Sequence, residues 1–378
     1  MELVIERGFL LSGLAMVQGI VERRNTVPIL GHALLEPSGT DLILTATDLA
    51  VGIRTAIACK SCEGNSITLN ARKLFEIVRE AAGDEVQLKS LDNDWVELKC
   101  GRARFKMMGL DPRQFPAMPR PGEHKPEAAA QRKGVKVELA IEASVLANMI
   151  DKTIFAVSPD ETRYNLSGVY IEAPDPGAVV MVATDGHRLS MIRCDAKGFE
   201  MQGGAIIPRK GLGELRKLLD GEGEVKLSLD GQLAWLKRGP TEVSMRLVEG
   251  EFPDYRGVMP AQSRHQIKID RDQLLDAVKR AAIFSNERFH GVKLTFADGS
   301  LTVSSTSPDL GEASETVDVE FRGEELSIGF NAMYLIQALS IIAGGSEVVL
   351  GVTDEVSPGV LGTPADAGYT YVVMPMRL

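Results

Sequence analysis

The sequence predicts an α+β fold of three similar domains in tandem, each with two helices packed on antiparallel sheets. The main observation is a long internal repeat, because three landmarks return after the same spacing of 137 residues. They are Thr47-Asp48 with Thr184-Asp185, Arg72-Lys73 with Arg209-Lys210, and Phe115-Pro116 with Phe252-Pro253. A third, shorter copy ends in Val373-Met374-Pro375, which matches Val258-Met259-Pro260. Solenoid units are about 20–50 residues long, so a repeat of this length is a repeated domain.

The second observation is that each copy has the same predicted order of elements: a helix, strands, a second helix and further strands. Hydrophobic spacing predicts first helices at 9–23, 143–155 and 271–284, and second helices at 70–82, 208–219 and 331–343. Alternating runs predict strands at 41–47, 178–184 and 300–305, and closing strands at 85–90, 95–99, 224–229 and 232–237. Two helices and an antiparallel sheet pack as an α+β layer.

Two segments have the composition of joints between domains. Residues 119–134 are rich in proline, alanine and charge, and a shorter joint lies at 260–264. We therefore expect domains at residues 1–126, 127–260 and 261–378.

The composition is that of an ordinary soluble globular protein, with 44% hydrophobic and 25% charged residues in a chain of 378. No apolar run approaches the ~20 residues of a membrane span, and the N-terminus lacks the pattern of a signal peptide. Four cysteines do not make a disulfide framework, so we expect a reducing cytoplasm and no membrane. The net charge of −10 argues against a surface that is basic all round, but permits a local basic face.

Two fragments have the residue types of a catalytic or metal site. Cys59 and Cys62 have zinc-ligand or redox spacing, but no second pair stands at a suitable distance. Asp185 beside His187 suits a hydrolase base, although the same residues are also a turn signal. Phosphate-binding loops, dinucleotide fingerprints and the His-Glu-x-x-His motif are absent. The sequence thus predicts no cofactor and no metal, and a hydrolase remains the alternative from another class.

The predicted helices carry a modest excess of positive charge. In 208–219, four basic residues stand against the single acid Glu214. Such residues are most simply the solvated faces of amphipathic helices. If three copies are arranged alike, however, their helices form one surface on which small excesses add. Such a surface suits contact with a nucleic-acid backbone without base readout.

Motifs along the whole chain resemble those of the bacterial beta sliding clamp, the processivity subunit of DNA polymerase III. The C-terminal residues 371–378 resemble the closing motif of that family. Residues 183–189, 207–211, 251–255 and 328–331, and Arg24 with 28–31, are similar to its other signatures in the right order.

The resemblance implies a non-catalytic homodimer that closes head to tail as a six-domain, ring-forming DNA clamp. Helices would line the hole, through which double-stranded DNA passes without sequence preference. The implied partners are the clamp loader complex, the DNA polymerase III alpha subunit and other proteins with a clamp-binding motif, including repair proteins. A clamp paralogue or loader-independent DNA scaffold with altered partners is the alternative within this class.

The resemblance also implies a hydrophobic pocket for partner peptides between the second and third domains. Its wall would comprise Leu166, Thr184, Gly186, His187, Arg188, Leu189, Pro253, Val258, Asn331, Tyr334, Val372, Val373, Met374, Pro375, Met376, Arg377 and Leu378. Methionine and aliphatic side chains make an adaptable apolar groove. Gly257 stands where the best-known members carry arginine, and Pro358 where they carry serine, so we expect a reshaped rim.

DNA contacts and a dimer seam are implied in the same way. The implied DNA-binding residues are Arg24, Arg163, Tyr164 and Lys210, while Asn165 replaces a tyrosine found in some members. At the seam, Phe105 and Met107 would face Ile283 and Phe284, and Lys73, Arg102 and Arg104 would lie near Glu312 and Glu315. Heterologous contacts of this kind close into a ring when the rotation is right.

Overall fold

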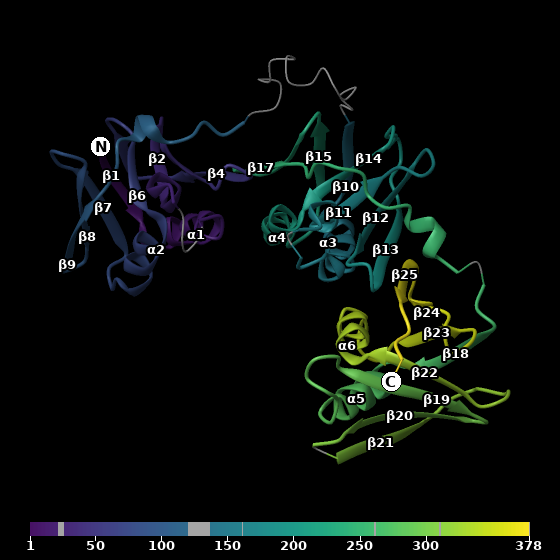
Figure 1. Ribbon diagram of the computed structural model, residues 1–378. Helices are drawn as coiled ribbons and strands as arrows, with labels where there is room; N and C mark the ends of the chain where they lie inside the picture. The colour runs from purple at the N-terminus through teal and green to yellow at the C-terminus, as the bar shows by residue number, and fades with distance from the viewer. Residues whose placement is uncertain (22–25, 120–136, 161, 261, 310, 378) are drawn as a thin grey trace. The chain divides into compact units, whose positions relative to one another are not determined.

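The computed structural model describes residues 1–21, 26–119, 137–160, 162–260, 262–309 and 311–377 (Figure 1). Arg24, Leu378 and nearly all of the predicted linker lie outside these residues. The chain forms two compact units, one of Met1–Ser144 with Lys210–Leu247 and the other of Val145–Arg209 with Val248–Leu378. Each unit therefore contains part of the second predicted domain, and the domain boundaries near 126 and 260 stay a prediction.

The first unit contains helices α1, α2 and α4 and two antiparallel sheets. Its first-copy elements are β1 (Glu2–Glu6), α1 (Arg7–Val17), η1 (Pro28–Gly31), β2 (His32–Ser38), β3 (Asp41–Thr47), β4 (Val51–Ala58), β5 (Ser61–Glu63), β6 (Ile67–Asn70), α2 (Ala71–Glu80), β7 (Glu85–Ser90), β8 (Trp95–Cys100), β9 (Ala103–Met108) and η2 (Pro112–Gln114). Its second-copy elements are β10 (Val137–Glu142), α4 (Arg209–Leu218), β15 (Glu224–Asp230), β16 (Leu233–Arg238) and β17 (Thr241–Arg246).

The second unit contains helices α3, α5 and α6. From the second copy it has α3 (Ala143–Asp151), η3 (Ile154–Ala156), η4 (Tyr164–Leu166), β11 (Gly168–Glu172), β12 (Ala178–Thr184), β13 (Arg188–Asp195), β14 (Gly204–Pro208) and η5 (Tyr255–Val258). From the third copy it has β18 (His265–Asp270), α5 (Arg271–Ala282), β19 (Gly291–Ala297), β20 (Ser300–Ser307), β21 (Gly311–Asp318), β22 (Leu326–Asn331), α6 (Ala332–Ser340), β23 (Glu347–Val352), β24 (Gly359–Thr363) and β25 (Asp366–Val373).

In each unit, one sheet runs without a break from one copy of the repeat into the next. The first has the strand order β10-β15-β16-β17-β4-β3-β2-β6, and the second has the order β14-β11-β12-β13-β25-β24-β23-β18. The joining pairs are β17 with β4 and β25 with β13, both antiparallel. We call these pairs the first joint and the second joint (Figure 1).

The two joints are made by equivalent strands in the same register. At the first joint Val51 pairs with Met245, and at the second joint Arg188 pairs with Val373. Arg188 follows Val51 by the repeat spacing of 137 residues, so the internal repeat is also a repeat of the joint.

Each of the two smaller sheets ends in a strand whose outer edge is not paired with any other described strand. Their orders are β5-β1-β7-β8-β9 and β21-β20-β19-β22. β9 is the last strand of the first copy. β21 is the third copy's equivalent of β4 and β13, because the hairpin of β20 and β21 corresponds to those of β3 and β4 and of β12 and β13.

The helices α2, α5 and α6 begin where a side chain accepts hydrogen bonds from the first amide groups. Asn70 caps α2 at Lys73 N (3.0 Å), Asp270 caps α5 at Gln273 N (2.9 Å), and Asn331 caps α6 at Met333 N (2.8 Å). Such side-chain caps satisfy amides that have no partner within the helix. One face of each of these helices is buried, for example Leu74 and Val78 in α2.

The α+β prediction with antiparallel sheets is confirmed, and each copy contributes two of the six helices seen in the described residues. Several predicted helix ends were too long. The helix predicted at 9–23 ends at Val17, and the helix predicted at 143–155 ends at Asp151 and is followed by the short η3. Continued apolar periodicity caused the overestimate at α1, because Ile20 and Val21 are buried beyond its last residue. No helix among the described residues is long and apolar enough to cross a membrane.

We predict that Gly368→Ala weakens the second joint. A Cβ atom at Gly368 would lie 2.1 Å from the backbone oxygen of Arg193 on β13, so β25 would have to move away from that strand. We expect a loss of about 1–3 kcal/mol in the free energy of unfolding, measured in urea. Gly362→Ala on β24 is the matched control, because its Cβ would be 3.5 Å from the nearest atom. Equal unfolding midpoints for the two variants would contradict the prediction.

Candidate functional site

A small apolar hollow of about 140 Å³ lies at the second joint, within the second unit. It is lined by Leu166, Thr184, Gly186, Arg188, Leu189, Pro253, Asp254, Tyr255, Val258, Val372 and Met374. All but Asp254 and Tyr255 belong to the set that the sequence predicted for a partner pocket. Residues up to about 200 positions apart in the chain therefore meet here because β13 pairs with β25.

Other predicted pocket residues lie outside the lining. His187 is exposed, Val373 is buried, and Asn331 caps α6. Tyr334 lies beneath Arg188, with the guanidinium 4.4 Å from the ring centre. The remaining predicted residues are Pro375, Met376 and Arg377, which follow β25, and Leu378, which lies outside the described residues.

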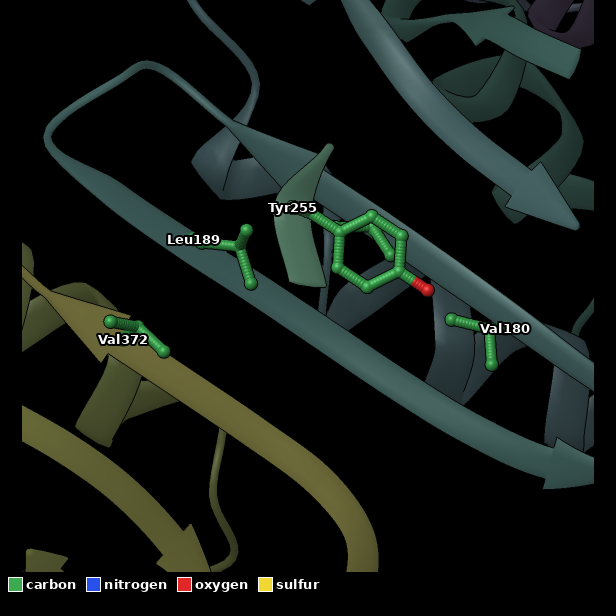
Figure 2. Packing of buried hydrophobic residues seen from close by; sticks show 5 residues of the cluster. Val180, Leu189, Tyr255 and Val372 are labelled. Atoms are coloured by element: carbon green, nitrogen blue, oxygen red, sulfur yellow. The ribbon is translucent and has the colours of Figure 1, made fainter. Parts of the chain in front are cut away.

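A compact apolar cluster shares Leu189, Tyr255 and Val372 with the lining of the hollow. It consists of Val180, Val182, Leu189, Tyr255 and Val372, four of which are labelled in Figure 2. Met374 and Val258, by contrast, are 37% and 40% exposed. Large apolar side chains that stay exposed next to a buried cluster indicate a binding surface.

The Thr-Asp landmark of the repeat closes the loop on one side of the hollow. Thr184 Oγ1 donates to Arg188 O (2.6 Å), and Asp185 Oδ1 accepts from His187 N (2.9 Å) and Arg188 N (3.1 Å). Gly186 has a φ of +90°, which favours glycine. In the first copy Thr47 and Asp48 make the same contacts, with Oγ1 to Val51 O (3.0 Å) and Oδ1 from Val51 N (2.6 Å). The repeated motif is thus a loop-closing device.

Arg188 is the most heavily bonded side chain of the site. It is 7% exposed and forms an ion pair with Asp185 (Nε to Oδ2, 3.1 Å). It also donates to Phe155 O (2.8 Å) and to the side chain of Gln337 on α6. A buried charge is tolerated only when paired and hydrogen-bonded, so this side chain holds β13 to η3 and α6.

The two joints carry different side chains at equivalent positions. Where the second joint pairs Leu189 with Val372, the first pairs Gly52 with Ser244. Met118 covers Gly52, because its Cγ would lie 3.1 Å from a Cβ placed there. The difference in side-chain volume and polarity at one pair of positions could have been found in the sequence, had the joint register been known.

The predicted DNA-binding residues differ in their availability. Tyr164 is 61% exposed. Arg163 is about half exposed and donates to Asp185 O (3.3 Å). Lys210 forms an ion pair with the buried Asp48, so its charge is partly neutralised within the first unit. Arg24 lies outside the described residues.

Most of the predicted seam residues lie on or near the two sheet ends, whereas Lys73 lies on α2. Phe105 on β9 and Ile283 after α5 are 37% and 69% exposed. Arg104 and Met107 also lie on β9, Arg102 lies in the turn before it, and Phe284 follows Ile283. Glu312 and Glu315 lie on β21, where Glu315 pairs with Arg280 (2.6 Å), and Lys73 pairs with Glu76 (2.7 Å).

The cysteine pair shows no sign of metal or redox chemistry. Cys59 and Cys62 are free thiols, and burial raises the pKa of Cys59 to about 12, so the reactive thiolate is disfavoured. Within the described ranges no group of three or more His, Cys, Asp or Glu side chains is placed to hold a metal ion.

Comparison with known proteins identifies the family. Models of the N-terminal, central and C-terminal domains of the DNA polymerase III beta subunit match residues 1–119, 140–254 and 256–377. The chain belongs to the DNA polymerase III beta subunit family. It is 36% identical to the beta sliding clamp of Caulobacter vibrioides over 385 residues, and 36% identical to that of Pseudomonas aeruginosa over 381 residues, with all of each chain covered.

Solved sliding clamps have the same fold. The Pseudomonas aeruginosa sliding clamp bound to griselimycin is 35% identical, with a TM-score of 0.90. The Bartonella birtlesii sliding clamp bound to griselimycin is 32% identical, with a TM-score of 0.91. Both matches cover all of both chains. The predicted resemblance to the sliding clamp family is confirmed.

We predict that Arg188→Ala destabilises this sliding clamp strongly. The variant leaves Asp185 buried without its cation, for which a cost of about 3–5 kcal/mol is typical. Arg193→Ala on the same strand is the control, because its ion pair with Asp175 is exposed and such pairs contribute about 0–1 kcal/mol. Urea unfolding followed by tyrosine and tryptophan fluorescence measures both. Similar losses in the two variants would show that the buried network is not a main support of the joint.

Proposed function

We propose that this chain is a DNA sliding clamp and processivity factor that closes as a ring around duplex DNA. It tethers the replicative polymerase and repair proteins through the apolar hollow at the second joint, and it works in the cytoplasm. The observation that carries the proposal is that a chain matched by the beta-subunit models over residues 1–119, 140–254 and 256–377 exposes Met374 and Val258 at that joint. Three clamp domains at residues 1–126, 127–260 and 261–378 are part of the proposal.

Ring closure is supported by the pairing of strands across the copies. The last strand of the second copy, β17, pairs with β4, and the last strand of the third copy, β25, pairs with β13. The last strand of the first copy, β9, and the third copy's equivalent strand, β21, are left at the ends of their sheets. A second copy of the chain offers the missing partner to each, which is a heterologous contact that closes a head-to-tail homodimer.

The joint register also predicts which residues meet at the seam. Ile53 pairs with Val243 at the first joint. By the registers of the hairpins, Ala313 on β21 is equivalent to Ile53, and Phe105 on β9 is equivalent to Val243. Phe105 would then lie opposite Ala313, and Lys106 opposite Glu312. β9 carries Arg104 and Lys106 where β21 carries Glu312 and Glu315, so the edges are complementary in charge.

A closed ring accounts for the modest positive charge of the helices. Purely electrostatic binding to DNA weakens steeply with salt, whereas a ring is retained by topology and slides while its contacts stay weak. An ATP-driven loader complex is required to open such a ring. The proposed DNA contacts are Arg24, Arg163, Tyr164 and Lys210.

The clamp is proposed to be a non-catalytic subunit. The carboxylate of Asp185 is occupied by two amides and Arg188, which supports a structural role rather than that of a hydrolase. In the pocket, the apolar lining suits short peptides from the DNA polymerase III alpha subunit and other clamp-binding proteins. A Cβ at Gly257 would meet no atom within 4 Å, so this exposed rim is open where the best-known members have arginine.

Retention on DNA should depend on DNA topology. After loading on nicked circular DNA, the clamp is expected to stay bound at a salt concentration that abolishes electrostatic binding. Linearising that DNA should release it, because a ring slides off the ends. Gel filtration of labelled clamp with each DNA measures the bound fraction, and equal retention on both forms would refute the topological mechanism.

The seam should be broken by charge at its apolar centre. Ile283→Asp with Phe284→Asp is expected to yield monomers in sedimentation velocity, because two carboxylates would be buried against Phe105 and Met107. Phe289→Asp is the control, since Phe289 is 55% exposed in the same loop but is not among the predicted seam residues. Intact dimers of the double variant would show that the seam lies elsewhere.

A further inference from the structure

A buried glutamate lies behind the pocket wall, outside the lining of the hollow. Glu172 ends β11 and is 7% exposed. One of its oxygens accepts from Tyr255 Oη (2.5 Å) and from the guanidinium of Arg256, and the other accepts from Tyr170 Oη (3.3 Å). A buried carboxylate needs such donors to offset its loss of hydration.

Two of these donors come from the short helix η5, which forms one wall of the hollow. Tyr255 and Val258 both line the hollow, and the ring of Tyr255 packs in the cluster with Leu189 and Val372. In Figure 2 the hydroxyl oxygen of Tyr255 is at the end of the ring away from Leu189. The apolar part of Tyr255 therefore faces the pocket cluster while its polar end is held by Glu172. The guanidinium of Arg256 lies 4.8 Å from the centre of the same ring.

The strand β11 supports this wall with a second side chain on the same face. Tyr170, two residues before Glu172, stacks on Phe252 with ring centres 4.9 Å apart and an angle of 8°. Gly204 makes room for Tyr170, because a Cβ there would lie 2.2 Å from the ring. Burial and the hydrogen bond to Glu172 raise the pKa of Tyr255, so the phenol keeps the proton that it donates.

We propose that Glu172 is a positioning residue for the partner pocket, which sets the place of η5 and hence the fit of the bound peptide. The inference rests on the proposed function of the hollow as a peptide site. η5 is too short to hold its own position, since it is a single turn, Tyr255–Val258, that follows the exposed Asp254 and contains the exposed Gly257. The bonds to Glu172 attach it to a sheet strand, which is the rigid part of the site.

The test measures how fast the full-length dimer dissociates from an immobilised peptide copied from the C-terminal tail of the polymerase III alpha subunit. Glu172→Gln is expected to dissociate about tenfold faster than wild type, because a hydrogen bond to a charged acceptor is replaced by a weaker one. Glu200→Gln removes the same charge at an exposed site in the same copy and is expected to leave the rate unchanged. The dissociation rate reports only folded protein, so a mere loss of stability does not change it.

Tyr255→Phe keeps the ring and removes the hydroxyl that donates to Glu172. This variant tests the same contact if Glu172→Gln fails to fold. It should also speed dissociation, and the double variant should be no faster than the more severe single variant, because both act through one bond. Dissociation of Glu172→Gln and Tyr255→Phe at the rate of Glu200→Gln would overturn the positioning role alone. If wild type does not bind the peptide, or deleting Met376–Leu378 does not weaken binding, the proposed pocket fails and the inference fails with it.

Discussion

Backbone pairing of strands from successive copies is the constraint on which the rest of the structure depends. At the second joint, five residue pairs from Arg188–Val373 to Ile192–Tyr369 make one sheet out of two copies of the repeat. Backbone hydrogen bonds carry no side-chain specificity, so the same joint is made twice from different residues. The pairing also leaves β9 and β21 as sheet ends, which is the physical basis of the proposed dimer. An exposed sheet end is a template for another strand, and a ring satisfies both ends at once.

The two joints differ in what their side chains do. At the first joint, Gly52 and Ser244 leave little apolar surface, and Met118 covers the glycine. At the second joint, Leu189 and Val372 build a cluster that extends to the exposed Met374. The duplicated joint therefore exposes apolar side chains at the second copy of a position that holds Gly52 and Ser244 in the first. Different side chains at a few equivalent positions of the two joints are sufficient for this difference in exposed apolar surface.

Buried charge supports the pocket from two sides. Arg188 connects β13 to α6, and Glu172 connects β11 to η5. An apolar surface formed only by loops would lose conformational entropy when each loop became ordered on binding its ligand. Here the loop from Thr184 to Arg188 and the turn at Tyr255 are attached to strands by hydrogen bonds before any peptide arrives. The exposed apolar side chains are thus presented on a preorganised frame.

The sequence by itself determined the repeat, the fold class and the family, because these depend on spacing and periodicity. The predicted order of elements was wrong at the start of each copy, where the strands β1, β10 and β18 precede the first helix. It also predicted, through motifs that resemble the family, a set of partner-pocket residues that includes Leu189, Val258 and Met374, and these three line the hollow. It did not reveal Tyr255 or Glu172, since an aromatic residue after Phe-Pro and a glutamate at a strand end are common where nothing is bound. Helix ends were overestimated because buried residues such as Ile20 continue the apolar pattern beyond the last turn.

Only the tertiary structure decided that Asp185 closes a loop, that Lys210 is paired with Asp48, and that Glu172 stands behind the pocket. Each of these depends on which side chains meet across strands far apart in the chain, and local sequence does not record the register that brings them together.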